Sequence, residues 1–491
     1  MKKFIISIDQ GTTSSRAILF DLKGKPIFTS QTEFTQYFPK DGWVEHDPEE
    51  IWKTTLKVFK EVIKKSKKLK GKVLTIGITN QRETTVAWSK STGKPLYNAI
   101  VWQDTRTQDI CDEIINTESL KDEILHTGLP VATYFSLTKI IWLLRNVKNI
   151  QDAAQKDDLC FGTVDSWLLY KLSGKHVTDI TNASRTLMFN LHTSDWSMPI
   201  IEKFNIPFTS LPNVQPSLSL FVENTELLKN VPITAVLGDQ QASLFGHKAY
   251  QVGDSKNTYG TGCFLLSNTG TDIVQSQNGL ISTVAYQIEN EEPVYALEGS
   301  VAIAGSSVQW LRDNIGLIDK SSDIENLALL VKDNGGVYFV PAFSGLFSPH
   351  WDPSARGTIA GMTRHTNKSH IARSVIESVA YQADELLKAF ELDLGVKLST
   401  LSVDGGMTAN NLLMQFQADI SNLQIQSQKI QEVTAFGAGL ASYVYINDIR
   451  LDTISANQSR EQTWSPNMND NIRFDYLNNW NKAIGKAKNW M

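Results

Sequence analysis

The sequence has few cysteines, and none of them forms a metal-binding pattern. The chain of 491 residues contains three, Cys111, Cys160 and Cys263, which lie far apart and without a CxxC spacing. This arrangement excludes a zinc site of the finger type and a disulfide framework. Isolated thiols are typical of a reducing compartment, so we expect a cytoplasmic protein.

Long hydrophobic runs and a large excess of one charge are also absent. No apolar stretch approaches the roughly 20 residues that a membrane-spanning helix needs. Lys2 and Lys3 are followed by only a short apolar run before Asp9, too short for a secretory signal. The formal net charge is −5, which gives no reason to expect an anionic partner. We therefore expect no membrane insertion and no nucleic-acid partner.

The best-known nucleotide-binding and zinc-protease patterns are missing as well. The chain contains no GxxxxGK[ST], no GxGxxG and no HExxH. A nucleotide, if one binds, must therefore be bound by a different sequence motif. A chain of 491 residues is too long for one hydrophobic core, so two domains are expected. We place their boundary so that residues 1–252 form the first domain and residues 253–491 form the second.

What the sequence does contain, near its start, is a hairpin with an unusual tip. An apolar run ends at Asp9, Gly11 and the hydroxyl residues Thr12 to Ser15 follow, and a second apolar run begins at Ala17. Small residues let backbone N–H groups approach an anion, and hydroxyls add donors. A carboxylate beside a polyphosphate requires a cation such as Mg²⁺ between them. The tip is either an ordinary polar turn or a magnesium–nucleotide site.

Polar residues also follow three later strands of the expected fold. The predicted strand over 73–79 ends in Asn-Gln-Arg-Glu, and the strand over 233–237 ends in Gly-Asp-Gln-Gln before a helix predicted over 242–247. The strand over 401–403 ends in Asp-Gly-Gly, which we expect to turn directly into a helix carrying Asn410. Open α/β sheets bind their ligands at such carboxyl ends of strands.

The second half of the chain opens in the same way as the first. Strands are predicted over 255–259 and 264–267, joined by Gly-Thr-Gly at residues 260–262. This pattern indicates a diverged internal copy of the hairpin at Asp9 that lacks the acid. A nucleotide held between two duplicated domains would use both tips.

Helical periodicity predicts several longer segments away from these motifs. We expect a helix capped by Asp47, one from about 105 to 125, one over 371–394 ending at Gly395, and a last helix over 474–490. A shorter helix through Leu172 is predicted to use Asp165 as its N-cap.

The motifs, taken in order, resemble those of the FGGY carbohydrate kinase family along nearly the whole chain. No single motif is decisive, but their order over both halves is highly specific. The segments that carry the resemblance are Asp9–Arg16, Asn80–Thr85, Tyr134–Trp142, Gly238–Gln241, Tyr259–Cys263, Gly357–Glu377 and Asp404–Gly406.

This resemblance implies an α/β fold of two actin-like ATPase (ribonuclease H-like) domains, each built on a five-stranded sheet. Nucleotide and substrate would lie in the cleft between them. The form of the motif at Arg82 and Glu83 is similar to that of the members that phosphorylate glycerol. The resemblance thus implies transfer of the ATP γ-phosphoryl group to glycerol, with Mg²⁺. It also leads us to expect a homo-oligomer, a dimer or a tetramer.

The resemblance further implies roles for individual residues. Asp239 would be the general base and would also face the metal, Asp9 would position Mg²⁺ through water, and Arg16 would offset phosphate charge. Apart from the resemblance, Trp102 and Phe264 are candidate apolar walls. Glycerol would be held by Arg82, Glu83, Tyr134, Asp239 and Gln240. The nucleotide would be held by Thr12, Thr13, Ser14, Arg16, Thr261, Gly305, Gln309, Gly406 and Asn410.

Two departures from the family pattern bear on control. The segment between Pro212 and Asp239 is short and contains no His or Arg, which puts regulation by a sugar bisphosphate or by a phosphorylated His in doubt. Ser348 and His350 differ from the residues expected there, and we interpret His350 as a structural loop residue.

Three alternatives remain open at this point. The first is an FGGY kinase for another polyol, a ketopentose or a sugar acid. The second is a non-metabolic actin-like ATPase, which would have no use for Arg82 and Glu83 beside Asp239. The third is a degenerate regulatory member, which the presence of every candidate catalytic residue disfavours.

Overall fold

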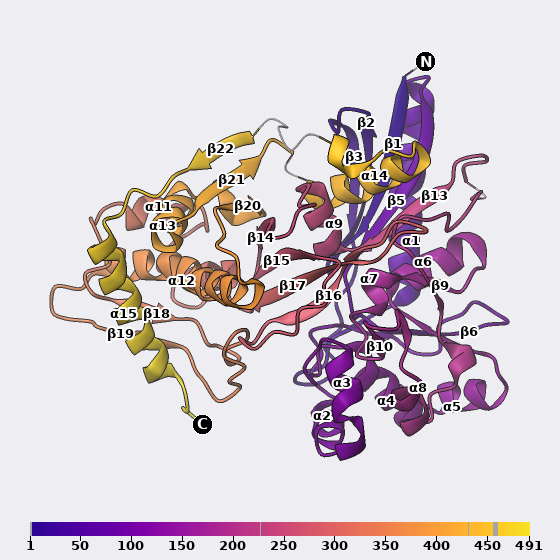
Figure 1. The fold of residues 1–491 in the computed structure, drawn as a ribbon, viewed down its shortest axis with the longest axis horizontal. Helices are drawn as coiled ribbons and strands as arrows, with labels where there is room; N and C mark the ends of the chain where they lie inside the picture. Colours follow the sequence, from indigo (N-terminus) through magenta and orange to yellow (C-terminus); the bar gives the residue numbers. More distant parts are fainter. Residues whose placement is uncertain (1, 226, 431, 455–459) are drawn as a thin grey trace.

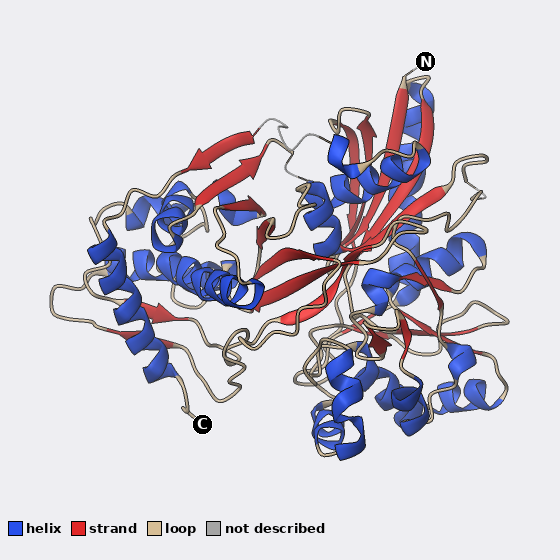
Figure 2. Ribbon diagram, viewed as in Figure 1, coloured by secondary structure: helices blue, strands red, loops and turns tan. Residues whose placement is uncertain are grey.

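The chain folds into two α/β lobes that pack against each other (Figures 1 and 2). The computed structural model describes residues 2–225, 227–430, 432–454 and 460–491. Within these ranges, no helix is both long and apolar enough to cross a membrane. The expected fold class is confirmed by the two mixed sheets and the helices that cover them.

The N-terminal sheet is built around the predicted hairpin. Its five described strands have the order β13-β5-β1-β2-β3. The hairpin strands β1 and β2 pair antiparallel, β3 continues antiparallel, and β5 and β13 run parallel to β1. Helix α1 (Pro48–Lys68) covers this sheet and begins at its predicted N-cap, Asp47. The strand bounds are β1 (Lys3–Gln10), β2 (Ser14–Asp21), β3 (Pro26–Glu33), β5 (Lys72–Asn80) and β13 (Ile233–Gly238).

The C-terminal sheet repeats this plan and extends it. Its inner strands, in the order β21-β20-β14-β15-β17, have the same sequence of parallel and antiparallel pairs as the first sheet. The predicted internal copy is therefore present. The expectation of five strands was wrong here, because β16 and β22 add to the two edges. The bounds are β14 (Ser255–Tyr259), β15 (Cys263–Gly270), β16 (Ile281–Tyr286), β17 (Val294–Val301), β20 (Thr400–Asp404), β21 (Gln424–Gln428) and β22 (Arg460–Trp464).

One helix from the second half of the chain packs on the first sheet. Helix α14 (Val433–Ile446) contacts β1, β5 and β13, and it lies against α9 (Asp239–Gly246). Figure 1 shows α14, yellow-orange, beside the indigo strands of the N-terminal sheet. The chain thus returns to the first lobe late in the sequence. The boundary placed between residues 252 and 253 stays a prediction.

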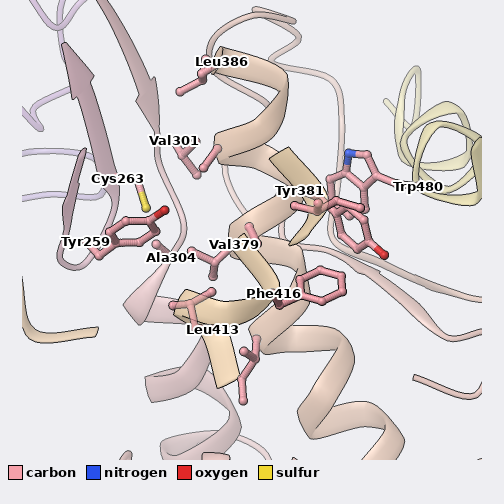
Figure 3. Packing of buried hydrophobic residues seen from close by; sticks show 14 of the residues in the cluster. Tyr259, Cys263, Val301, Ala304, Val379, Tyr381, Leu386, Leu413, Phe416 and Trp480 are labelled. Carbon is pink, nitrogen blue, oxygen red and sulfur yellow. The ribbon is translucent and has the colours of Figure 1, made fainter. Parts of the chain in front are cut away.

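The core of the second lobe is formed by long helices packed on its sheet. Helix α12 (Lys368–Leu394) ends at Gly395 in the left-handed conformation, as predicted. The ring of Tyr381 on α12 stacks on Trp480 of α15 (Asp470–Ala487) at 4.9 Å and 11°, and it meets Phe416 of α13 (Asn411–Ser421) edge-on (Figure 3). These contacts hold α13 in place, and with it the turn that precedes it.

Two local predictions were wrong. The helix expected over 105–125 is broken into α2 (Gln108–Ile115), a 3-10 turn and α3 (Lys121–His126), because the side chains of Asn116 and Thr117 hydrogen-bond to backbone carbonyls one turn back. Asp165 does not cap α6 (Val164–Ser173), which begins after Thr163. Its buried carboxylate accepts hydrogen bonds from Thr163 and Thr178, and so ties α6 to β9.

The remaining elements complete the two lobes. Helix α4 begins at Ser136, and α10 begins at Gly305. The bounds are α4 (Ser136–Asn146), α5 (Lys148–Gln155), α7 (Ile180–Ala183), α8 (Met198–Lys203), α10 (Gly305–Asp313), α11 (Asp323–Ala328), β4 (Glu45–His46), β6 (Val86–Ser89), β7 (Ala99–Ile100), β8 (Leu159–Gly162), β9 (Val177–Asp179), β10 (Phe189–Asn190), β11 (Asp195–Trp196), β12 (Asn213–Gln215), β18 (Tyr338–Val340) and β19 (Thr358–Ala360).

Candidate active site

The polar residues predicted after β5 and β13 meet at one edge of the N-terminal sheet. The two strands are parallel neighbours, with Gly238 opposite Asn80 in the register. Arg82 Nε consequently lies 3.4 Å from Asp239 Oδ1. Helix α9 begins at Asp239, three residues earlier than predicted, so the carboxylate sits at its first turn. Arg82 is buried, whereas the Asp239 side chain keeps 32% of its surface exposed.

The backbone is strained next to this pair. Glu83 adopts the left-handed conformation with a φ of 59°, which is unfavourable for a residue with a side chain. Hydroxyls of Ser136 and Thr85 donate to its carbonyl at 3.0 and 3.1 Å. The Glu83 carboxylate accepts from Arg185 Nε at 2.6 Å. Surrounding contacts therefore fix the direction of this side chain.

The absence of a side chain at Gly238 makes room for Arg82. A Cβ atom at this position would lie 2.7 Å from Arg82 Cδ and 2.8 Å from Gln241 Oε1. Both distances are far below ordinary contact. The Arg82 side chain can cross the end of β13 only because this residue is glycine.

Three aromatic rings form a cluster beside the polar pair, and two of them, Trp102 and Phe264, are the candidate pocket walls. Trp102 and Tyr134 come from the first lobe, and Phe264 comes from β15 of the second. The Trp102 ring lies 5.4 Å from that of Tyr134 and 6.5 Å from that of Phe264. All three are partly exposed. Trp102 Nε1 also donates to Thr12 Oγ1 at 3.1 Å, which connects the wall to the first hairpin tip.

The predicted nucleotide residues lie on the two hairpin tips and on the elements beside them. Thr12 and Thr13 form the first tip, whereas Ser14 is already in β2 and its hydroxyl accepts from Gln31. In the second tip, the Thr261 carbonyl accepts from the backbone of residues 304 and 306, and Gly305 N donates to Gly260 at 3.0 Å. Gln309 is exposed on α10.

The Asp-Gly-Gly turn follows β20 and differs from the expectation in one respect. A 3-10 turn over Gly406–Ala409 comes first, so Asn410 is the N-cap of α13 and accepts from Leu413 N, rather than lying inside the helix. Gly405 has a φ of 94°, and a Cβ there would lie 2.3 Å from the Tyr259 carbonyl. Gly406 is exposed beside it.

This geometry can be compared with known proteins. A family model described as the N-terminal domain of the FGGY family of carbohydrate kinases matches residues 4–246, and the model of the C-terminal domain matches residues 255–444. The chain belongs to the FGGY family of carbohydrate kinases.

Individual members of the family are similar over their full length. The chain is 50% identical over 498 residues to a protein named glycerol kinase from Clavibacter michiganensis subsp. michiganensis, covering 100% of this chain and 99% of the relative. It is 48% identical to a glycerol kinase of Chloroflexus aggregans, covering 100% of both. The crystal structure of Plasmodium falciparum glycerol kinase with ADP superposes with a TM-score of 0.92 at 38% identity, over 99% of this chain and 98% of that one. A xylulose kinase of Lactobacillus acidophilus shares the fold, with a TM-score of 0.84 at 22% identity over 99% and 97%.

The electrostatics of this FGGY-family site depend on residues that the sequence reasoning missed. Glu298 of β17, Arg185 after α7 and Lys256 of β14 are all buried. Glu298 stands among largely apolar neighbours in its strand, whereas Lys256 is flanked by Ser255 and Asn257. A buried charge is costly unless it is paired, so the charged residue inside the apolar strand β17 was the available signal, and Lys256 had none.

Lys256 orients one of the predicted substrate residues. Its ammonium group donates to Gln240 Oε1 at 2.5 Å and to Thr258 Oγ1 at 3.0 Å. Burial lowers the pKa of Lys256 to about 8, although Asp404 and Glu298 oppose this shift. Because the Gln240 oxygen faces Lys256, its Nε2 group is the one directed elsewhere.

The candidate base is tuned by its surroundings. Burial raises the pKa of Asp239, and the positive charges of Arg82 and Lys256 act in the opposite direction. A carboxylate with a raised pKa accepts a proton more readily near neutral pH.

A magnesium ion fits the carboxylates at the first hairpin tip. Burial raises the pKa of Asp9 to about 6; Arg16 opposes the shift, while Glu432 and Asp239 add to it. A cation between Asp9 and Asp239 would relieve this repulsion. Among the described residues no group of three or more His, Cys, Asp or Glu could hold a metal. Mg²⁺ needs fewer, since it binds through one or two carboxylates, substrate phosphates and water.

Two further residues have partners that bear on their predicted roles. Arg16, expected to offset phosphate charge, is ion-paired with Glu432 just before α14. His350 hydrogen-bonds to Glu385 and to Lys488 at 3.1 and 3.0 Å. These bonds tie a loop to the interior of α12 and to the end of α15, in keeping with the structural interpretation of His350.

Proposed function

We propose that this chain transfers the γ-phosphoryl group of ATP to glycerol and releases sn-glycerol 3-phosphate and ADP. The observation that carries the proposal is the meeting of Arg82, Glu83 and Asp239 beneath three partly exposed aromatic rings. The similarity to proteins named glycerol kinase, one of them solved with ADP, supports both the acceptor and the nucleotide.

Glycerol offers hydroxyl groups on a short carbon chain, and the pocket offers matching groups. Arg82 provides an Nε–H donor and Glu83 provides carboxylate acceptors for neighbouring hydroxyls. Gln240 contributes an amide donor and Tyr134 a phenol. The rings of Trp102 and Phe264 would cover the carbon chain and limit the length of the acceptor.

The reaction requires alignment, removal of one proton and exclusion of water. In the proposed mechanism, Asp239 accepts the proton of the terminal hydroxyl as its oxygen bonds to the γ-phosphorus. The bond from phosphorus to the bridging β–γ oxygen breaks, and ADP leaves with the electron pair. Mg²⁺, bound near Asp9 and Asp239, would neutralise phosphate charge. Contact between the lobes keeps out water that would otherwise take the phosphoryl group.

The nucleotide would lie across both hairpin tips. Thr12, Thr13 and Ser14 supply donors from the first lobe, and Arg16 would exchange Glu432 for a phosphate. Thr261 would supply donors from the second lobe, and Gly305, whose N–H is bonded to Gly260, would leave room for the phosphates by its lack of a side chain. The base and ribose would rest on the surface formed by Gln309, Gly406 and Asn410.

A coupled assay of ADP formation tests the proposal. Mg·ATP is supplied with glycerol, with a ketopentose, or without an acceptor. Turnover with glycerol alone is the expected result. Turnover with the ketopentose alone would keep the fold and the role of Asp239 but reject the roles of Arg82 and Glu83. Turnover independent of any acceptor would indicate an actin-like ATPase instead.

Three broader expectations stay predictions. These are a homo-oligomer, either a dimer or a tetramer, a cytoplasmic location, and the division of the chain after residue 252. Light scattering coupled to gel filtration would measure the first.

A further inference from the structure

Glu298 reaches from the second lobe into the glycerol site of the first. It lies near the middle of β17 and is fully buried. Its two carboxylate oxygens accept from Arg82 Nη1 and Nη2 at 2.6 and 2.7 Å, which is a bidentate ion pair. Its Oε1 also lies 3.3 Å from Arg185 Nη2. One side chain of the C-terminal sheet therefore holds two arginines of the N-terminal lobe.

The bidentate pair determines which atom of Arg82 faces the substrate. Glu298 engages both terminal nitrogens, and Nη1 also donates to Gln241 Oε1 at 3.1 Å. The guanidinium plane is then fixed, with Nε 3.4 Å from Asp239 and 3.8 Å from Glu83. Rotation of Arg82 would break two charge-assisted hydrogen bonds at once.

The pair also balances the charge of the site. Arg82, Arg185 and Lys256 lie among Glu83, Glu298 and Asp239, so three positive charges are balanced by three negative ones when Asp239 is ionised. Burial works against the ionised form of Glu298, but Arg185 and Arg82 outweigh it and lower its pKa to about 2. Glu298 thus stays charged at every pH at which the protein would work. A neutral polyol meets a site with no excess positive charge.

We propose that Glu298 is a positioning and specificity-determining residue of the acceptor site. Glu298 fixes the orientation of Arg82 across the interface between the lobes and neutralises the charge of Arg82. The site therefore accepts neutral polyols and rejects anionic sugar acids. This inference rests on the proposed function. It makes the acceptor site complete only while the two lobes are in contact, which couples glycerol binding to closure of the cleft.

The test is Glu298→Gln, which keeps the shape of the side chain and removes its charge. We expect the KM for glycerol to rise about tenfold or more while the KM for ATP changes less than about twofold, because Arg82 loses its anchor. We also expect kcat/KM for glycerate, relative to glycerol, to rise about tenfold, because the site gains a net positive charge. A purely structural role would not change this ratio.

Glu377→Gln is the matched control. Glu377 is equally buried and is ion-paired with Arg373 on α12, away from the acceptor site. Its glycerol KM and its acceptor ratio should equal those of the wild type. If the Gln variant does not fold, Glu298→Asp takes its place in the test. The shorter side chain keeps the negative charge but moves the carboxylate away from Arg82, so we expect a KM for glycerol between those of the wild type and the Gln variant.

The possible failures can be told apart. A wild-type protein without glycerol turnover would overturn the proposed function, and this inference with it. An active wild type whose folded Glu298 variants keep both the glycerol KM and the acceptor ratio would overturn the inference alone.

Discussion

The two sheets share one strand plan but carry different polar groups at their ends. In the N-terminal sheet, β1, β5 and β13 end near Asp9, Arg82 and Asp239, whose side chains face the cleft. In the C-terminal sheet, the matching strands β14 and β20 carry Lys256 and Asp404, which are buried and paired. The N-terminal lobe thus carries the candidate catalytic and substrate-binding residues, and the C-terminal lobe carries buried charged residues that orient them.

The contacts between the lobes show how this division works. Lys256 holds Gln240, and Glu298 holds Arg82, each reaching from the second lobe to a predicted substrate residue of the first. Asp404 accepts from Ser243 Oγ at 2.7 Å and hydrogen-bonds to His247 Nε2 at 2.7 Å, both on α9. Burial disfavours the charged form of Asp404, but His247, Lys256 and Ser243 together outweigh it and lower the pKa of Asp404 to about 2. The turn that would hold the adenosine is therefore tied to the helix that begins at the candidate base.

The largest effect is expected from the base itself. Asp239→Asn removes the proton acceptor and leaves the shape of the site, so kcat should fall by about two orders of magnitude or more. Calorimetry should show that ATP still binds. Asp195→Asn makes the same change on an exposed residue of β11 and should leave kcat unchanged. A near-normal kcat in the first variant would remove Asp239 from its role.

The next largest effect is expected from Arg82 at the lobe interface, where the affinity for glycerol and the stability of the fold can be measured separately. Arg82→Ala should raise the KM for glycerol and not that for ATP, and it should destabilise the fold by about 3–5 kcal/mol because the buried Glu298 loses its bidentate partner and keeps only Arg185. The double variant Arg82→Met with Glu298→Leu removes both charges and should recover most of the stability. It should not recover the affinity for glycerol. Recovery of both would mean that the pair has only a structural role.

A smaller effect, on the KM for ATP and not on that for glycerol, is expected from a change in the second lobe. Gly405→Ala places a methyl group 2.3 Å from the Tyr259 carbonyl, at a φ that disfavours any side chain. It should cost about 1–3 kcal/mol of stability and raise the KM for ATP rather than that for glycerol. Gly485→Ala, which has open space and lies in a helix, is the control. A shift in the glycerol KM alone would break the proposed division between the lobes.

The smallest effect concerns pH and magnesium. Because the pKa of Asp9 is raised to about 6, this carboxyl takes up a proton as the pH falls through that value, and Mg²⁺ must compete with it. Activity should fall on the acid side, and added Mg²⁺ should move this limb to lower pH. A limb that ignores Mg²⁺ concentration would reject the metal role of Asp9.

The same shift has a consequence for folding. An acid with a raised folded-state pKa contributes stability at low pH that is lost as the pH rises through the interval from its unfolded value to about 6. Asp9→Asn should therefore stabilise the metal-free protein above pH 6, as measured by thermal unfolding.

Much of the fold followed from local patterns. The apolar run before Asp9 predicted the first hairpin, and Asp47 predicted the start of α1. Prediction from local sequence failed where a polar side chain could hydrogen-bond either to the nearby helix terminus or to residues distant in the sequence. Asp165 was predicted to be an N-cap, but it lies inside the first turn of α6, and its carboxylate accepts hydrogen bonds from Thr163 and Thr178, which nothing nearby in the sequence indicates. The extra strands at the sheet edges depend in the same way on distant partners.

The sequence by itself determined which residues carry the candidate chemistry. Arg82, Glu83 and Asp239 stand directly after buried strands, and the period of apolar residues is enough to place them at a sheet edge. Only the tertiary structure decided what neutralises and orients them. Glu298 is separated from Arg82 by 216 positions, and hydrogen bonds between such distant residues leave no local pattern, because pairing across an interface depends on how the lobes pack and not on spacing along the chain.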